Sequence, residues 1–211
     1  MGTKIKKADF IYDEITKLFP NAKCELNYRK DYELLIAIML SAQTTDISVN
    51  KVTETLFEKY HSVADFANAE LKELENDIRR IGLFRNKSKN VKAMAEIIVN
   101  DFNLTIPNTQ VELEGLPGVG RKTANVFLAE FYRIPRIAVD THVSRVSKRL
   151  RFAKETDTPE KIEEKLKKAF PKYKWISLHH KFIFFGRYFC KAKKPGCLHC
   201  PIIKYCKNPI I

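Results

Sequence analysis

The chain has 211 residues, and its 38 Lys and Arg outnumber its 25 Asp and Glu, for a formal net charge of +13 at pH 7. This length allows one large domain or two smaller ones, and the basic surplus favours a polyanionic partner. The longest plain apolar run, 34–40, is about a third of the roughly 20 residues that a membrane-spanning helix needs, so we expect no membrane partner. Residues 1–7 do not resemble a signal peptide, which predicts a cytoplasmic protein.

The first half of the chain reads as a series of helices. Apolar residues recur at helical spacing over 8–19, and 32–40 is apolar nearly all round, which predicts a buried central helix. A polar stretch then leads into another helix, with Thr45 or Asp46 as its N-cap. Gln43 stands in this stretch with no apolar role to fill.

Two short helical pieces follow over 63–81, and Leu83 then stands beside Gly82 at a turn flanked by basic residues. An apolar tip on a basic rim could wedge between bases of a nucleic acid. Burial behind a glycine cap is the commoner fate of such a leucine. The residues alone leave both interpretations open.

A glycine hairpin between two helices is predicted over 109–131. The capping box that starts at Thr109 predicts a short helix to about Glu114. Gly118 and Gly120 then permit a positive φ. Apolar residues at i, i+3, i+4 and i+7 predict the second helix: Ala124, Phe127, Leu128 and Phe131.

Such a hairpin directs backbone N–H groups toward an anion beside a helix N-terminus, which suits a phosphate group of any nucleic-acid sequence. The predicted contacts are Gly118, Val119, Gly120 and Arg121. An ordinary turn with a glycine cap explains the same residues. The basic pair Arg121 and Lys122 favours the phosphate site.

Lys122 and Asp140 are the two candidates for chemistry. Lys122 lies almost opposite the apolar stripe of its helix, in the first turn, where the helix dipole disfavours a cation. It is a candidate Schiff-base nucleophile, and phosphate contact or plain solvation are the alternatives. Asp140 begins a basic helix and could simply cap it. No segment reads as a strand, so the predicted fold class is all-α.

Four of the five cysteines are close together near the C-terminus: Cys190, Cys197, Cys200 and Cys206. The spacing C-x6-C-x2-C-x5-C lets four thiolates converge on one centre, either zinc or a cubane iron–sulfur cluster, and spacing alone does not choose between them. Disulfides are a poorer explanation in a reducing compartment. Three lysines occupy the first loop between cysteines and could be solvated or contact phosphates: Lys191, Lys193 and Lys194.

Together these motifs resemble endonuclease III, a family of helix-hairpin-helix DNA glycosylases with a role in base excision. The resemblance rests on the hairpin at 116–125 (LPGVGRKTAN), on AVDTH at 138–142, on SAQTTD at 41–46, on IGL at 81–83 and on the cysteine spacing. It covers nearly the whole chain in order, and the combination is far more specific than the hairpin alone.

The resemblance implies a bifunctional DNA glycosylase and abasic-site lyase that removes damaged bases, with oxidised pyrimidines as the expected class. Lys122 matches the catalytic lysine and Asp140 the catalytic aspartate. Gln43 and Leu83 match residues that fill the hole and wedge the opposite strand after a nucleotide is flipped out. The four cysteines match the ligands of a [4Fe–4S] cluster, and the lysines between them match a DNA-contacting loop.

The family fold implies two helical domains with a DNA cleft between them. A six-helix domain over 24–134 carries the hairpin. A four-helix iron–sulfur domain joins 1–23 to 135–211, with the cluster loop at 190–206. The expected partner is double-stranded DNA with damaged bases or abasic sites, bound by a monomer at the nucleoid.

Two alternatives stay open. An adenine-mismatch glycosylase of the same superfamily lacks the nucleophilic lysine and usually carries a further C-terminal domain, whereas this chain has Lys122. A non-catalytic DNA-binding protein could use the hairpin and the metal loop only as clamps. The presence of both Lys122 and Asp140 argues against it.

Overall fold

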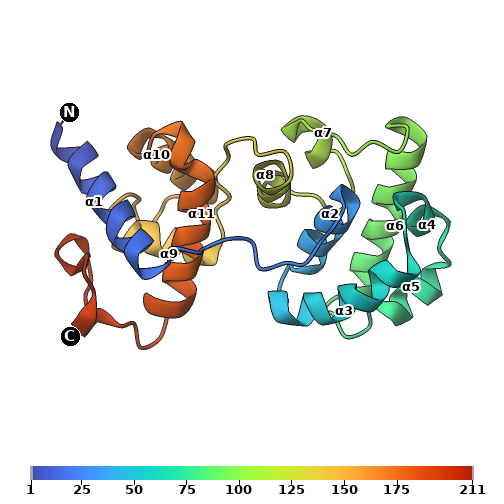
Figure 1. The fold of residues 1–211 in the computed structure, drawn as a ribbon, viewed down its shortest axis with the longest axis horizontal. Helices are drawn as coiled ribbons and strands as arrows, with labels where there is room; N and C mark the ends of the chain where they lie inside the picture. The colour runs from blue at the N-terminus through green and yellow to red at the C-terminus, as the bar shows by residue number, and fades with distance from the viewer. Residues whose placement is uncertain (1, 211) are drawn as a thin grey trace. The chain divides into compact units, whose positions relative to one another are not determined.

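The computed structural model describes residues 2–210, with side chains from residue 7 on, and over this range the protein is helical without a β-strand (Figure 1). The all-α prediction is confirmed. The helices are α1 (Gly2–Leu18), α2 (Asp31–Leu40), α3 (Asp46–Lys59), α4 (Val63–Asn68), α5 (Leu71–Asp77), α6 (Phe84–Asp101), α7 (Gln110–Glu114), α8 (Arg121–Glu130), α9 (Thr141–Arg149), α10 (Pro159–Ala169) and α11 (Trp175–Phe184). Within residues 2–210, none of them combines the length and the apolar character that crossing a bilayer requires.

The chain divides into two compact units. One is formed by residues 25–132, and the other joins the residues up to Cys24 to those from Arg133 on. The roles expected for these two parts of the chain stay predictions.

The unit of residues 25–132 is built around α2. Every residue from Tyr32 to Leu40 is buried, which confirms the predicted central helix. It packs against α3, α6 and α8, while α6 also supports α4 and α5, and α7 packs on α8. Even the buried Glu33 is satisfied, because its carboxylate accepts the backbone N–H groups of Arg29 and Lys30.

The second unit packs α1, α9, α10 and α11 around an apolar core. Large buried members of this core are Ile11, Ile15, Val143, Val146, Leu178, Phe182 and Phe185. Helix α11 ends at Phe184, and a π-helical turn covers Phe185–Phe189. The turn widens because the N–H of Cys190 bonds the carbonyl of Phe185, five residues back.

Candidate functional site

The hairpin between α7 and α8 forms as its sequence predicts. The Thr109 hydroxyl accepts the backbone N–H of Glu112 and caps α7. The N–H of Val119 then bonds the carbonyl of Leu116 and closes the turn. The side chains of Leu116 and Val119 are both buried. The apolar residues of the hairpin therefore hold it to the protein, and the N–H of Val119 is engaged within the turn.

The two hairpin glycines differ. Gly118 has φ +77°, and a Cβ there would lie 2.8 Å from the Cβ of Asn90 on α6, so glycine is needed both for conformation and for space. Gly120 has φ −89° and is the N-cap of α8, so the positive φ considered for it is wrong. No atom lies within 4 Å of its would-be Cβ, which leaves open space beside the first turn of α8.

Lys122 is exposed in this first turn, next to the exposed Arg121. The N–H groups at the start of a helix have no partner within the helix and carry its positive dipole end, so an anion is favoured here. Ala129, which helical geometry places on the side of Lys122, is buried, because α8 is covered along most of its length. Lys122 thus presents its amine at the exposed end of an otherwise embedded helix.

Asp140 lies in the other compact unit, at the N-cap of α9. One carboxylate oxygen accepts the N–H of Val143 at 2.7 Å, which confirms the capping role. The Arg145 guanidinium, one turn along α9, interacts electrostatically with this carboxylate. The buried His179 ring contacts the carbonyl of Ala138 at 2.9 Å and fixes the chain that leads into Asp140. Capping α9 uses one carboxylate oxygen of Asp140, so it does not exclude a catalytic role for the other oxygen.

Gln43 and Leu83 are both exposed, and both have a left-handed backbone, with φ of 57° and 60°. Leu83 is 57% exposed, so the burial considered from the sequence is wrong. The reason is that Leu83 precedes α6 as its N-cap, whereas the buried residue of this turn is Ile81. The two turns adjoin, because a Cβ on Gly82 would lie 3.9 Å from the Gln43 carbonyl oxygen.

An exposed basic rim surrounds Leu83 in the sequence: Arg79, Arg80, Arg85 and Lys89. These residues extend the basic flank that the sequence indicated. They have the charge that phosphate contacts need.

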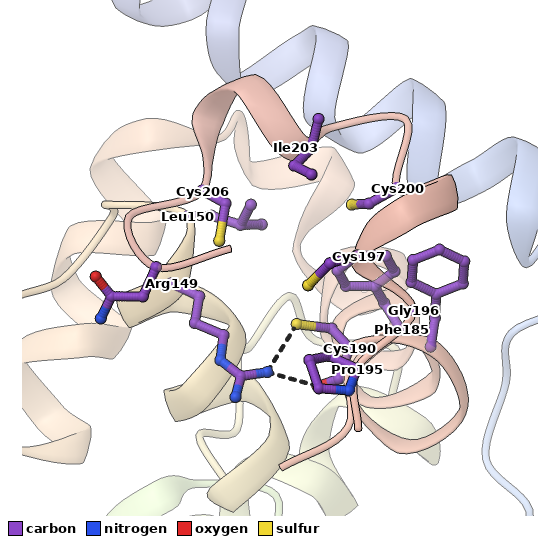
Figure 2. Close-up of a pocket in the computed structure, with 12 residues that line it drawn as sticks. Arg149, Leu150, Phe185, Cys190, Pro195, Gly196, Cys197, Cys200, Ile203 and Cys206 are labelled. Atoms are coloured by element: carbon purple, nitrogen blue, oxygen red, sulfur yellow. Dashed lines mark hydrogen bonds between the residues drawn. The ribbon is translucent and has the colours of Figure 1, made fainter. Parts of the chain in front are cut away.

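The four clustered cysteines line one pocket, and Figure 2 shows their sulfur atoms directed into the same space. The pocket measures about 380 Å³ including its open side, and Leu150, Phe185 and Ile203 contribute apolar walls. All four cysteines are free of disulfides. Burial raises the pKa of the Cys190 and Cys200 thiols, so a bound cation would be needed to keep them as thiolates.

The donor set of this pocket is four thiols on short loops, which is the soft-ligand chemistry of zinc and iron–sulfur centres. The Cys200 thiol interacts electrostatically with the other three. Across the described part of the chain, no three His, Cys, Asp or Glu side chains stand close enough to hold one metal ion, so the four sulfur atoms are not arranged as a single-ion site such as zinc.

Two arginines of α9 fix the start of the cysteine loop. Arg149 donates to the Cys190 sulfur at 3.2 Å (Figure 2) and also to the Lys191 carbonyl, at 2.8 Å. Arg145 donates to the carbonyls of Cys190 and Gly186. A Cβ on Gly186 would lie 2.9 Å from the Cβ of His142, so glycine permits this close approach to α9. The sequence marked α9 as basic but did not indicate this bracing role.

The three lysines of this loop are exposed: Lys191, Lys193 and Lys194. The backbone that carries them is anchored by Arg149 at its first residues. A basic loop held in one conformation loses little entropy when it meets phosphates.

Comparison with known proteins agrees with this arrangement. Residues 36–172 match the model of the HhH-GPD superfamily base excision DNA repair protein. The chain is 46% identical to endonuclease III of Bacillus subtilis (strain 168), covering 97% of this chain and 93% of that protein. It is 42% identical to endonuclease III of Escherichia coli (strain K12), over 89% of both. The chain belongs to the endonuclease III family.

Solved structures share the fold of this chain. A trapped endonuclease III–DNA covalent intermediate, in an estranged-adenine complex, superimposes with a TM-score of 0.94 at 49% identity, over 98% of this chain and 97% of that one. A thermostable thymine-DNA glycosylase at 24% identity shares the fold, with a TM-score of 0.86 over 96% of both chains.

The superfamily match includes Gln43, Leu83, the hairpin, Lys122 and Asp140, but ends before the cysteines. The relatives that match nearly the full length extend the likeness over the C-terminal loop.

Proposed function

We propose that the protein is a DNA glycosylase and abasic-site lyase of base excision repair, which acts as a monomer on damaged duplex DNA in the cytoplasm. Oxidised pyrimidines are the proposed class of damaged base. The observation that carries the proposal is the exposed Lys122 amine at the start of α8, directly after a hairpin that favours phosphate. A relative 49% identical to this chain has been trapped as a covalent intermediate with DNA.

Lys122 is the proposed nucleophile. Its neutral amine forms a bond to C1′ of a flipped-out nucleotide while the bond from C1′ to the damaged base breaks, and the base leaves with a proton. The C1′–O4′ bond then breaks, O4′ takes up a proton, and the nitrogen forms the C1′=N bond of an iminium. The iminium acidifies C2′, and loss of a C2′ proton expels the 3′-phosphate as the C3′–O bond breaks. Water finally hydrolyses the imine and regenerates the Lys122 amine.

Asp140 is the proposed electrostatic partner. Positive charge develops on the sugar as the base departs, and a fixed carboxylate stabilises it. The same group can accept and return protons between steps. Its bond to the N–H of Val143 holds the carboxylate in one orientation, which supports such a role.

The proposed DNA contacts follow from exposure and charge. Gly118, Gly120 and Arg121 would hold phosphates of one strand through backbone and side-chain donors. Gln43 would fill the space of the flipped nucleotide, and Leu83 would wedge the opposite strand. Neither group of contacts requires a particular base sequence.

We propose that Cys190, Cys197, Cys200 and Cys206 hold a [4Fe–4S] cluster, to which four thiolates are suited. When bound, the cluster holds the C-terminal loop folded, and Lys191, Lys193 and Lys194 then face phosphates from a rigid support. Purified protein should be brown and contain iron and sulfide in equal amounts. Colourless, folded protein with one zinc ion per chain would contradict this part of the proposal.

The activity is tested on duplexes that carry either an abasic site or an oxidised pyrimidine, with borohydride to trap a Schiff base. The native protein should cleave both and form a trapped adduct. Lys122→Ala should bind both and do neither, because only the nucleophile is lost. Arg121→Ala is the matched control, since it removes the neighbouring charge but should still trap. A native protein that cleaves neither duplex, or a Lys122→Ala variant that still traps, would overturn the proposal.

A further inference from the structure

Lys87 is a buried lysine in the first turn of α6, only 7% exposed. Lysine is almost never this buried unless its ammonium group is paired. Here Nζ donates to the carbonyls of Leu40 at 2.8 Å and Ala42 at 2.6 Å, and to the Thr44 hydroxyl at 3.2 Å. An ammonium has three donors, and all three are used. Burial lowers the pKa of Lys87, so the hydrogen bonds compensate a real desolvation cost.

Two of these acceptors flank Gln43 directly. Ala42 precedes it and Thr44 follows it, and the N–H of Thr44 closes the turn on the carbonyl of Ser41. Gln43 itself has φ 57°, a conformation that is unfavourable for a residue with a side chain and persists only where its surroundings impose it. The hydrogen bonds from Lys87 to Ala42 and Thr44, on either side of Gln43, supply that constraint.

Lys87 also hydrogen-bonds to Leu83, which like Gln43 is exposed and has a left-handed backbone. Its backbone N–H donates to the carbonyl of Leu83 at 3.1 Å, the first bond of α6. The turn before Leu83 lies against the Gln43 turn, with 3.8 Å between the would-be Cβ of Gly82 and the Thr44 hydroxyl. One residue therefore connects the two exposed turns.

We propose that Lys87 is a positioning residue, whose ammonium group holds the Gln43 turn against the Leu83 turn so that both side chains are preset before DNA binds. This inference rests on the proposed function, because it assigns Lys87 to the step in which a nucleotide leaves the duplex. Lys87 does not touch the DNA in this role. It acts through Gln43 and Leu83.

Lys92 provides a matched control on the same helix. Its Nζ also donates to two carbonyls, of Ala67 at 2.6 Å and Ala69 at 3.0 Å, but these lie at the C-terminal end of α4 and directly after it. Lys87→Met and Lys92→Met therefore each remove an ammonium that links α6 to backbone carbonyls of a neighbouring segment. Only the first releases the Gln43 turn.

The variants are compared in single-turnover cleavage of two substrates. A duplex with an oxidised pyrimidine requires extrusion, whereas a single-stranded oligonucleotide with an abasic site has no duplex to open. Lys87→Met should slow duplex cleavage by roughly 10- to 100-fold, the scale of a misplaced group, and leave single-strand cleavage within about twofold. Lys92→Met should affect neither by more than about twofold. In the Gln43→Ala background the Lys87→Met loss should shrink, because both act on one step.

Equal losses on both substrates, or a Lys87→Met variant with native duplex activity, would overturn the inference. If Lys87→Met does not fold, Thr44→Val decides, since it removes one acceptor at a partly exposed position and should still slow duplex cleavage selectively. Native duplex activity in Thr44→Val would then reject the inference. Failure of the native protein to cleave either substrate would instead reject the proposed function, and this inference with it.

Discussion

The two hairpin glycines allow a quantitative test of stability, because the backbone conformation requires glycine at Gly118 but not at Gly120. Gly118→Ala places a Cβ at a residue with φ +77°, only 2.8 Å from the Cβ of Asn90. The contacted atom is the first of the Asn90 side chain and cannot swing away. The left-handed conformation costs an alanine about 1–2 kcal/mol, and overpacking adds about 1–3 kcal/mol.

We therefore expect Gly118→Ala to lower the free energy of unfolding by roughly 3 kcal/mol. At about 2–4 °C per kcal/mol for a chain of this size, the midpoint of thermal unfolding should fall by roughly 6–12 °C. Gly120→Ser is the control, because Gly120 has φ −89°, open space around it and an N-cap role that serine fills well. Its unfolding midpoint should stay close to that of the native protein.

Thermal unfolding followed by circular dichroism measures both variants. The reasoning is refuted if Gly118→Ala unfolds with the native midpoint, or if Gly120→Ser is destabilised as much.

Three further predictions concern the other elements. Asp140→Asn keeps the cap, so stability should change by less than about 0.5 kcal/mol while base release falls roughly 100-fold or more; Asp140→Ala should in addition lose about 1 kcal/mol. Near-normal base release by the Asn variant would remove Asp140 from the chemistry. Burial and the hydrogen bond to Asp77 raise the pKa of Tyr60 to about 12, above about 10 in an unfolded chain, so stability should fall as pH rises from 10 to 12. That fall should be smaller in Tyr60→Phe, and equal pH profiles would contradict the assignment. Neutralising Lys191, Lys193 or Lys194 should each reduce the salt slope of DNA binding by about one unit. If none of the three variants changes the slope, the loop is merely solvated.

The parts of the fold that depend on local interactions were predictable. The buried central helix α2 follows from its unbroken apolar run, and Thr45, Thr109 and Asp140 cap their helices as their residue types indicate. A cap is decided by neighbours three residues away, so a single sequence contains the information.

The parts of the fold that depend on contacts between distant residues were not predictable from the sequence. The π-helical turn at 185–189 accompanies the close approach of Gly186 to α9, about forty residues earlier in the chain. The left-handed Gln43 depends on Lys87, which the sequence separates from it by three helices, α3, α4 and α5. A signal for Lys87 did exist, because it stands between Phe84 and Val91 on the apolar face of α6, where a lysine must find buried partners.

The candidate site was predicted through its motifs and the resemblance that they carry, whereas its supporting contacts needed the structure. The fold places Arg145 and Arg149 against the Cys190 loop through hydrogen bonds to backbone carbonyls. Backbone acceptors are present at every residue, so a sequence pattern cannot single them out.

The central claim is that the Lys122 amine forms the covalent bond to DNA. Borohydride reduction of the native protein on an abasic duplex, followed by proteolysis and mass spectrometry, locates the attached sugar. We expect the added mass on the peptide that contains Lys122 and on no other lysine peptide. An adduct on any other amine, or strand cleavage with no adduct at all, would contradict the account.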